Sequence, residues 1–374
     1  MSDCKTVRLG DVCEIITGGT PSTTKKEYWA NGTIPWLQSG VCQNCFVNKT
    51  ETFITQEGLD NSSAKLMPKD TVLIALTGAT TGKVGYLTFE ACANQSVTGI
   101  LPSKSFNQLY LYYCLLSKRE KILSDSYGGA QKHISQGYVK NLEVQMPNID
   151  KQNEIATILD EISNIITKHK LILEKYDTLI KSRFIEMFGD NPIENGKWKV
   201  EKLGNLGLCK NGMNFSYENN GFEINCLGVG DFKDNAVISN CEKLPVISLN
   251  EKPSEEYLLK DNDIVFVRSN GNKELVGRSV LVHPRVLTTF SGFCIRFRLS
   301  TDSINHLFLL QFLKMPNTRK NMAGRGANIQ NLNQQILSNL DIPVPQIELQ
   351  NDFSSFVQQI DKSKFEYAYM GVAA

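Results

Sequence analysis

The stretch NIDKQNEIATILDEISNIITKHKLILEKYDTLIKSRFIEMF, residues 148–188, decides how this chain is organised. It contains neither Pro nor Gly, whereas the whole chain has 12 Pro and 27 Gly. Apolar residues recur at three positions in every seven, as at Ile155, Ile158 and Leu159, which predicts a helix packed against more than one surface. Such a helix would be roughly 55–60 Å long. Gly189 followed by Pro192 predicts its end.

The composition is that of an ordinary globular protein. The chain has 374 residues, 41% hydrophobic and 21% charged, and a formal net charge of +1, so any phosphate binding must come from local patches. We expect two or three domains. Neither a membrane-spanning run nor an export signal is recognised, which predicts a soluble, cytoplasmic protein whose ten cysteines are reduced. Cys42 and Cys45 form a lone CxxC, which favours free thiols over a zinc site.

The chain repeats itself at a separation of about 194–198 residues. Residues 9–18 match 203–212, residues 139–142 match 337–340, and Gln152 matches Gln350. Between these matches we align residues 69–74 with 262–267, and Val84-Gly85 with Val276-Gly277. Several matches in the same order indicate two copies of one domain rather than a solenoid.

Each copy follows the same plan. Short β-branched and aromatic runs predict strands at 71–76, 83–87 and 97–101 in the first copy, and at 263–267, 278–282 and 293–299 in the second. An apolar helix follows (106–123; 304–315), then a Gly-rich loop, a Pro-containing strand and a further helix. We expect an α+β fold with a first domain at 1–147, a central helix at 148–189, a second domain at 190–346 and a shortened helix at 347–374.

This plan resembles the specificity (S, HsdS) subunit of Type I restriction–modification systems. The resemblance covers the whole chain. It rests on VRLGDVCEIITGGTP at 7–21, IPWLQSG at 34–40, PKDTVLIALTGATTGKVGYL at 68–87, GGAQKHIS at 128–135 and PNIDKQNEIATILDEI at 147–162. It implies two target recognition domains, each reading one half of a bipartite asymmetric DNA site. It also implies long helices that pack as an antiparallel coiled coil and set the spacing.

Three pairs of loops carry side chains suited to double-stranded DNA. Arg and Lys suit guanine and phosphate, and Asn and Gln suit adenine. The candidate DNA-binding residues of the first copy are Lys25, Lys26, Thr77, Thr80, Thr81, Lys83, Gln131, Lys132 and His133. Those of the second are Asn214, Tyr217, Arg268, Asn270, Asn272, Lys273, Arg325, Asn328 and Gln330.

The resemblance also implies partner subunits. Two methyltransferase (M) subunits, which would bind S-adenosylmethionine, and in the nuclease form restriction (R) subunits would dock on the helices. No cofactor and no metal are expected in this chain. The candidate subunit contacts are Ile158, Ile162, Ile165, Ile172, Leu179, Phe353, Phe356 and Ile360.

The two long helices are predicted to be unequal. Because the distal helix is the shorter, we expect residues 173–188 to lack a full-length partner within the chain. They would be covered by an M subunit, by a second copy of the chain in a homodimer, or by the flank of a domain.

Two other classes of function compete with DNA recognition. An adenine methyltransferase needs a [DNS]PP[FYW] cluster, which the Asn191-Pro192-Ile193 string lacks, and Glu255-Glu256 lacks the carboxylate spacing of a nuclease. We therefore expect no catalytic residue. A helical scaffold that binds only protein remains the alternative to DNA recognition.

Overall fold

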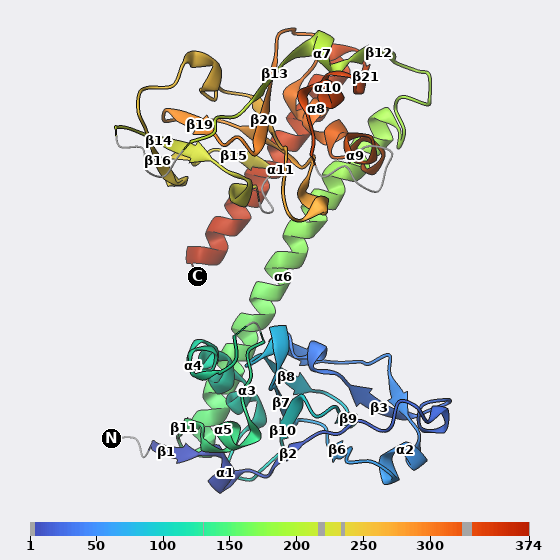
Figure 1. Cartoon of the computed structure of the whole chain (residues 1–374), viewed down its shortest axis with the longest axis vertical. Coiled ribbons are helices and arrows are strands. Elements are labelled where there is room, and N and C mark those ends of the chain that lie inside the picture. The colour runs from blue at the N-terminus through green and yellow to red at the C-terminus, as the bar shows by residue number, and fades with distance from the viewer. Residues whose placement is uncertain (1–3, 130, 216–220, 233–235, 324–330, 374) are drawn as a thin grey trace. The chain divides into compact units, whose positions relative to one another are not determined.

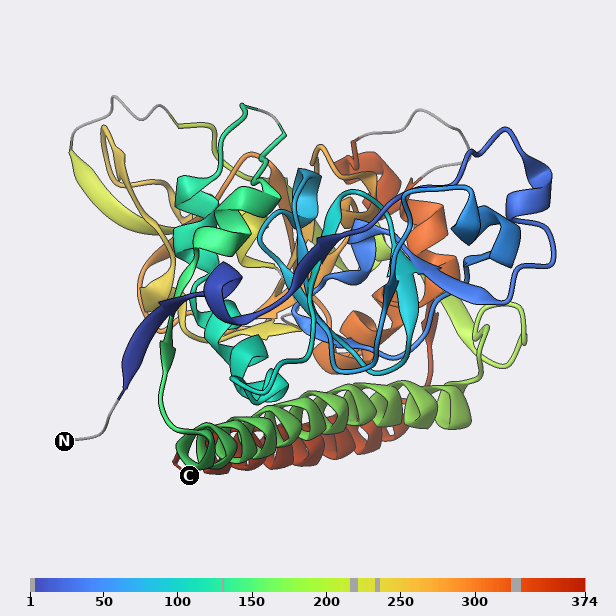
Figure 2. The ribbon, with the colours of Figure 1, turned by 90° about the horizontal axis from the view of Figure 1, so that it is seen from below.

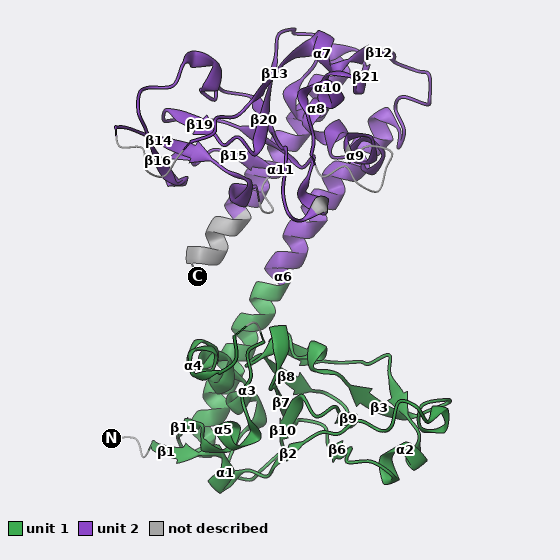
Figure 3. Cartoon of the chain, viewed as in Figure 1, with its two compact units in different colours: residues 1–167 green, residues 168–374 purple. Residues whose placement is uncertain are grey.

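The structure is a computed structural model that describes residues 4–129, 131–215, 221–232, 236–323 and 331–373. It divides into two compact units, unit 1 at residues 1–167 and unit 2 at residues 168–374 (Figure 3). The boundary falls inside one long helix, α6 (Ile149–Phe188), which begins in unit 1 and ends in unit 2.

Unit 1 is built on three sheets. Their strand orders are β1-β11, β2-β10-β7-β8-β4 and β5-β3-β9-β6. The strands are β1 (Lys5–Arg8), β2 (Ile15–Thr17), β3 (Ile34–Leu37), β4 (Cys45–Val47), β5 (Phe53–Ile54), β6 (Leu66–Met67), β7 (Val72–Ala75), β8 (Val84–Leu87), β9 (Ala91–Ala93), β10 (Val97–Ile100) and β11 (Glu143–Met146). The α-helices before α6 are α1 (Leu9–Val12), α2 (Gln56–Asp60), α3 (Gln108–Ser117), α4 (Arg119–Asp125) and α5 (Gln136–Asn141).

Unit 2 repeats this plan. Its sheets have the orders β12-β21, β13-β20-β17-β18-β15 and β16-β14-β19. The strands are β12 (Lys199–Lys202), β13 (Gly207–Asn211), β14 (Phe222–Leu227), β15 (Val237–Ile238), β16 (Val246–Leu249), β17 (Asp263–Val267), β18 (Ser279–Val282), β19 (Thr288–Phe290), β20 (Cys294–Leu299) and β21 (Asp341–Val344). The α-helices are α7 (Leu203–Leu206), α8 (His306–Leu313), α9 (Pro316–Ala323), α10 (Gln334–Ser338) and α11 (Ile347–Ala373) (Figure 1).

The predicted strands and the repeat are confirmed, but the register in the middle of the repeat was wrong by one residue. Asp70 and Asn262 share a left-handed φ of 66° and 65°, and their N–H groups donate to Leu87 and Val282. Asp70 is therefore equivalent to Asn262, not to Asp263. Asx residues tolerate this left-handed backbone better than other non-Gly residues.

A second alignment error follows the same loop. Gly277 was matched with Gly85, whereas its structural equivalent is Gly82. These two glycines have φ of 78° and 73°, and their N–H groups donate to the last residues of β17 and β7, Val267 and Ala75. A backbone requirement for Gly, rather than the neighbouring Val, is what the two copies share.

The largest buried cluster of each unit lies between its central sheet and the apolar helix that follows. In unit 1, Leu111 and Leu115 of α3 are fully buried with Val72 and Ile74 of β7. In unit 2, Phe308 and Leu309 of α8 play this part. The helix predicted over 106–123 is in fact two helices, α3 and α4, which meet at Lys118.

The second half of α6 packs antiparallel against α11 inside unit 2 (Figures 1 and 2). The ring centroids of Phe184 and Phe353 are 5.4 Å apart, and farther along the pair Lys364 forms an ion pair with Asp177 at 2.5 Å. Phe184 and Phe188 are 0% and 2% exposed. The predicted antiparallel packing of the two long helices is confirmed. The expectation that residues 173–188 lack a full-length partner within the chain was wrong, because α11 lies along this half. Of the three coverings expected, the flank of a domain is the one observed, since Phe184 and Phe188 lie in the core of unit 2.

Most of the exposed apolar side chains of α6 lie earlier in the helix, although Leu179 is also 46% exposed. Ile158, Ile162, Ile165 and Leu171 are 47–53% exposed. Among the helices of the described residues, none combines the length and apolarity needed to cross a membrane.

Candidate nucleic-acid interface

Loops distant in the sequence meet where strands β2, β7 and β10 of the central sheet of unit 1 begin or end. Leu76, at the end of β7, donates its N–H to Ser96, just before β10, at 2.8 Å, and accepts the N–H of Ile134 at 2.9 Å. The N–H of Gly18, just after β2, donates to Val97 at 3.0 Å. Antiparallel pairing of β10 with both β2 and β7 places these ends together.

The structure brings together two of the loops singled out in the sequence. Thr77 and His133 form a β-bridge, and Gly78 N–H donates to the carbonyl of Lys132 at 3.0 Å. Gln131 and Lys132 are exposed, and His133 is half-buried with its ring edge-on to that of Tyr127, at a centroid distance of 5.0 Å. The β7–β8 and α4–α5 loops thus form a single surface.

The side chains of the β7–β8 loop differ in what they can reach. Thr77 and Thr80 are half-buried. Thr81 is 2% exposed, and its hydroxyl lies 2.8 Å from the carbonyls of both Gly78 and Lys132, so in this conformation it ties the two loops together. Lys83 donates to Gln43 Oε1 at 2.5 Å.

Lys25 and Lys26 are exposed on a separate segment of unit 1. The Nζ of Lys25 donates to the hydroxyl of Tyr28 at 2.8 Å and lies 4.7 Å from its ring centroid. Their segment packs beside α2, where Thr55 donates to the carbonyl of Glu27 at 2.9 Å.

In unit 2, three backbone hydrogen bonds are equivalent to those just described for unit 1. The N–H of Arg268 donates to Phe293 at 2.8 Å, the N–H of Leu332 donates to Arg268 at 2.8 Å, and that of Gly212 donates to Cys294 at 3.0 Å. Arg268 and Phe293 are therefore equivalent to Leu76 and Ser96 of unit 1.

Several predicted residues of unit 2 lie at the equivalent strand ends of its own central sheet. The guanidinium of Arg268 donates to the carbonyl of Gly292 at 3.3 Å, and an added Cβ on Gly292 would collide with the exposed Asn214. Asn270 and Asn272 shape their own turn, since Asn270 Oδ1 accepts the N–H of Asn272 at 2.8 Å. Tyr217, Arg325, Asn328, Gln330 and the side chain of Lys273 lie outside what the structure describes.

Sequence reasoning missed one further loop, the turn that enters β10 or β20. In unit 1 it is Asn94-Gln95-Ser96, in unit 2 Ser291-Gly292-Phe293. Gln95 is exposed, and its Oε1 accepts the hydroxyl of Thr20 at 2.6 Å. Phe293 is 62% exposed. The only signal in the sequence was a pair of polar or Gly residues between two apolar strands.

The predicted subunit contacts fall into two groups. Ile158, Ile162, Ile165 and Leu179 are exposed on α6, with Ile172 half-buried between them. On α11, Phe353 is fully buried, Ile360 packs on the core of unit 2, and the ring of Phe356 lies 5.8 Å from the guanidinium carbon of Arg183. The α11 residues therefore have partners within the chain.

The loop surfaces carry amides, hydroxyls and cations. These groups donate hydrogen bonds to phosphates and base edges. Within the described ranges, no group of three or more His, Cys, Asp or Glu is arranged to hold a metal ion. Burial raises the pKa of the Cys42 thiol to about 12, which disfavours the thiolate that a metal would need.

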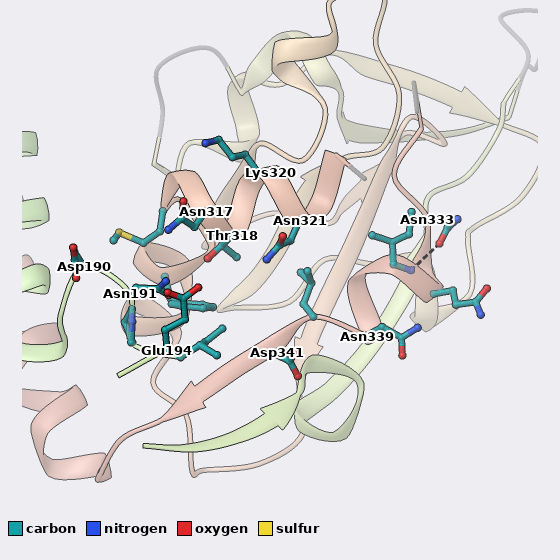
Figure 4. Close-up of a pocket in the computed structure, with 17 residues that line it drawn as sticks. Asp190, Asn191, Glu194, Asn317, Thr318, Lys320, Asn321, Asn333, Asn339 and Asp341 are labelled. Atoms are coloured by element: carbon teal, nitrogen blue, oxygen red, sulfur yellow. Dashed lines mark hydrogen bonds between the residues drawn. The ribbon is translucent and has the colours of Figure 1, made fainter. Parts of the chain in front are cut away.

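A polar pocket of about 770 Å³ lies elsewhere in unit 2, between the segment after α6, α9 and α10 (Figure 4). Asp190, Glu194 and Asp341 contribute carboxylates, and Asn317, Asn321 and Asn339 are also among its labelled residues. Asp341 is paired with Lys202 at 2.7 Å. Its three carboxylates make this pocket less suited to phosphates than the loop surfaces are.

Comparison with known proteins agrees with the repeat. The family model described as "Type I restriction modification DNA specificity domain" matches residues 1–175 and 195–367, one match for each copy. The Type I restriction enzyme EcoR124I/EcoR124II specificity subunit of Escherichia coli is 30% identical over 168 residues, which are 43% of this chain and 42% of that protein. The StySPI specificity subunit of Salmonella potsdam is 26% identical over 376 residues, covering 92% of this chain and 79% of that protein.

Structural comparison supports the same fold. The S subunit of a Type I restriction–modification system from M. genitalium aligns with a TM-score of 0.59 at 15% identity, covering 100% of this chain and 93% of that one. Two of the curated relatives are matched over only 42% and 52% of their length. Because the family model matches both copies over most of the chain, this protein belongs to the family of Type I restriction–modification DNA specificity subunits.

Proposed function

We propose that the chain is the DNA sequence-recognition subunit of a Type I restriction–modification complex. Each unit reads one half of a bipartite, asymmetric site. The observation that carries this proposal is the pair of equivalent loop surfaces, which share backbone hydrogen bonds but present different side chains. Arg268 and Phe293 stand in unit 2 where Leu76 and Ser96 stand in unit 1.

Two units with the same fold but different loop side chains suit a DNA site whose two halves differ in sequence. The loops present Gln131 and Lys132 in one unit and Asn214 and Arg268 in the other. Amide side chains pair with adenine and guanidinium groups with guanine, while lysines neutralise phosphates. Two similar surfaces with unlike side chains would read two unlike half-sites.

The helices would set the spacing and hold the catalytic partners. Two M subunits would dock on them and supply S-adenosylmethionine for adenine methylation, and R subunits would join in the nuclease form. The exposed apolar side chains Ile158, Ile162 and Ile165 of α6 support docking in this region. A homodimer through the same exposed apolar residues of α6 is the competing arrangement. Sedimentation of the chain with and without M subunits would distinguish a homodimer from a complex with M subunits.

Methylation mapping of DNA modified by the assembled M–S complex tests the proposal. We expect two short specific blocks separated by a fixed gap. Replacing residues 1–147 with those of another family member should change one block only. A change in both blocks would contradict the proposal that each unit reads one half of the site.

The alternative is a helical scaffold that binds protein alone. Salt-dependent binding of duplex DNA by the complex, with preference for the mapped site, would exclude it. Equal activity on all sequences would instead support the scaffold.

A further inference from the structure

We infer that the turn entering β20 is a specificity-determining element of unit 2, and that Phe293 recognises the C5-methyl group of a thymine in the major groove. This inference rests on the proposed function. It concerns a turn that the sequence did not single out, and it names the chemical group that the turn would read.

The turn is held in place from several sides. The carbonyl of Phe293 accepts the N–H of Arg268 at 2.8 Å, and its own N–H donates to Ser291 Oγ at 3.3 Å. The carbonyl of Gly292 accepts from the guanidinium of Arg268, and its N–H donates to Met213 at 2.6 Å. A turn fixed in this way presents its side chain without a large entropy cost on binding.

The ring of Phe293 is exposed although both its neighbours, Gly292 and Cys294, are buried. It is 62% exposed and belongs to no hydrophobic cluster of the described residues. A single exposed apolar residue is common on protein surfaces. Here, however, the turn that carries the ring adjoins two side chains suited to contact DNA: Arg268 donates to the carbonyl of Gly292, and a Cβ on Gly292 would meet Asn214.

The chemistry favours thymine. In the major groove thymine alone among the four bases presents a methyl group, and apolar side chains, Phe among them, contact it. Arg268 and Asn214 supply polar groups beside the same turn. An apolar contact with the methyl group distinguishes thymine from cytosine at one position.

Unit 1 provides an internal control. At the equivalent turn Ser96 replaces Phe293, and the exposed side chain is Gln95, whose Oε1 accepts the hydroxyl of Thr20. An amide reads hydrogen-bonding groups and does not require a methyl group. The half-site of unit 1 should therefore not depend on a thymine methyl group through this turn.

The test uses the assembled M–S complex and duplexes carrying its mapped site. Each thymine of the half-site read by unit 2 is replaced singly by uracil, which removes one methyl group and nothing else. For the wild-type complex we expect one such replacement to weaken binding about fourfold, as for loss of one buried methyl group. The variant Phe293→Ser, which copies the residue of unit 1, should bind the thymine and uracil duplexes equally.

Two further variants complete the experiment. Phe293→Leu should retain part of the preference for thymine, and Gln95→Ala should leave it unchanged. If no replacement weakens wild-type binding, or if Phe293→Ser keeps the preference, the inference fails. If Phe293→Ser weakened binding to the thymine and the uracil duplex by the same factor, the inference would also fail, because the ring would then contact DNA without contacting the methyl group. A wild-type complex without any sequence preference would instead contradict the proposed function.

Discussion

Gln152 and Gln350 make the same three hydrogen bonds in the two units. Gln152 Oε1 accepts the N–H of Asn107 at 2.9 Å, and its Nε2 donates to Pro147 and Ser105 at 2.8 and 3.1 Å. Gln350 bonds Asn305, Pro345 and Ser303 at 2.9, 2.8 and 3.0 Å. Each glutamine thereby fixes the first turn of a long helix, α6 or α11, to the start of the apolar helix of its unit.

Removal of either amide should destabilise its own unit. The two side chains are 1% and 0% exposed, so Gln152→Ala or Gln350→Ala leaves buried backbone groups without partners. We expect each to lower the free energy of unfolding by about 1–3 kcal/mol, measured by urea denaturation of the full chain. Lys151→Ala is the matched control, because its ion pair with Glu154 is exposed. An equal effect of the control would contradict a role for the buried amide.

Phe184 should be the most sensitive position on the second half of α6. It is fully buried, and its ring centroid lies 5.0, 5.5 and 5.4 Å from those of Phe188, Phe308 and Phe353. Phe184→Ala should cost about 3–5 kcal/mol of unfolding free energy through the cavity it leaves. Ile165→Ala, on the exposed part of the same helix, should cost far less, and comparable losses would mean that α11 does not seal this half.

Gly82 should tolerate alanine less well than Gly78. Both have positive φ, 73° and 77°, so either substitution costs about 1 kcal/mol or more from the backbone alone. A Cβ at Gly82 would also lie 2.8 Å from Ile122 Cγ2, whereas one at Gly78 meets nothing within 4 Å. In thermal denaturation, the melting temperature of Gly82→Ala should therefore be lower than that of Gly78→Ala. Equal melting temperatures would show that Ile122 moves aside freely.

Lys314 gives unit 2 a pH dependence. It lines a cavity of about 290 Å³ with Asp177, Asp361 and Lys364. Burial lowers its pKa to about 8 despite the attraction of Asp177, and the positive charges of Lys364 and Arg278 act in the same direction as burial. A folded-state pKa below that of the unfolded chain means that the unfolded state binds more protons between the two values. This contribution therefore becomes more favourable to folding as pH rises from about 8 toward 10.5.

Substitution of Lys314 isolates this effect from that of the buried cysteines, which titrate in the same range with the opposite sign. Lys314→Met should be more stable than wild type at pH 7 by about 1–3 kcal/mol, and the difference should shrink by pH 10. The exposed Lys362→Met serves as control. A difference that does not change with pH would show that Lys314 is not strained by burial.

The sequence predicted the elements better than the contacts between them. The strand over Asp263–Val267 and the helix over Ile149–Phe188 were found almost to the residue. The strand is a continuous β-branched and aromatic run, and the helix has a clear hydrophobic period. The equivalence of Asp70 and Asn262 was missed because it depends on backbone φ, which residue identity does not reveal. The antiparallel pairing of the two long helices was predicted, but not that α11 covers the half of α6 that carries Phe184. That depends on packing between segments more than 150 residues apart and not on local pattern.

The candidate site shows the same division. The loops of Thr77 and of Gln131–His133 were each recognised by composition, and the structure joins them. The turn of Gln95 and that of Phe293 were not recognised, since a three-residue turn between strands has no compositional signature. Only the pairing of β10 with β7, and of β20 with β17, places these turns beside the recognised loops.

Lys132 should contribute to DNA affinity without contributing to sequence choice. It is exposed on the loop bridged to Thr77, and a lysine there would neutralise a phosphate. In the M–S complex, Lys132→Ala should weaken binding to all duplexes alike and reduce the slope of log affinity against log salt by about 0.9. The control is Lys104→Ala, also exposed, which follows the opposite end of β10 and should leave the slope unchanged. If Lys104 changes the slope and Lys132 does not, DNA would approach the other edge of the sheet, and the loop surface described above would not be the interface.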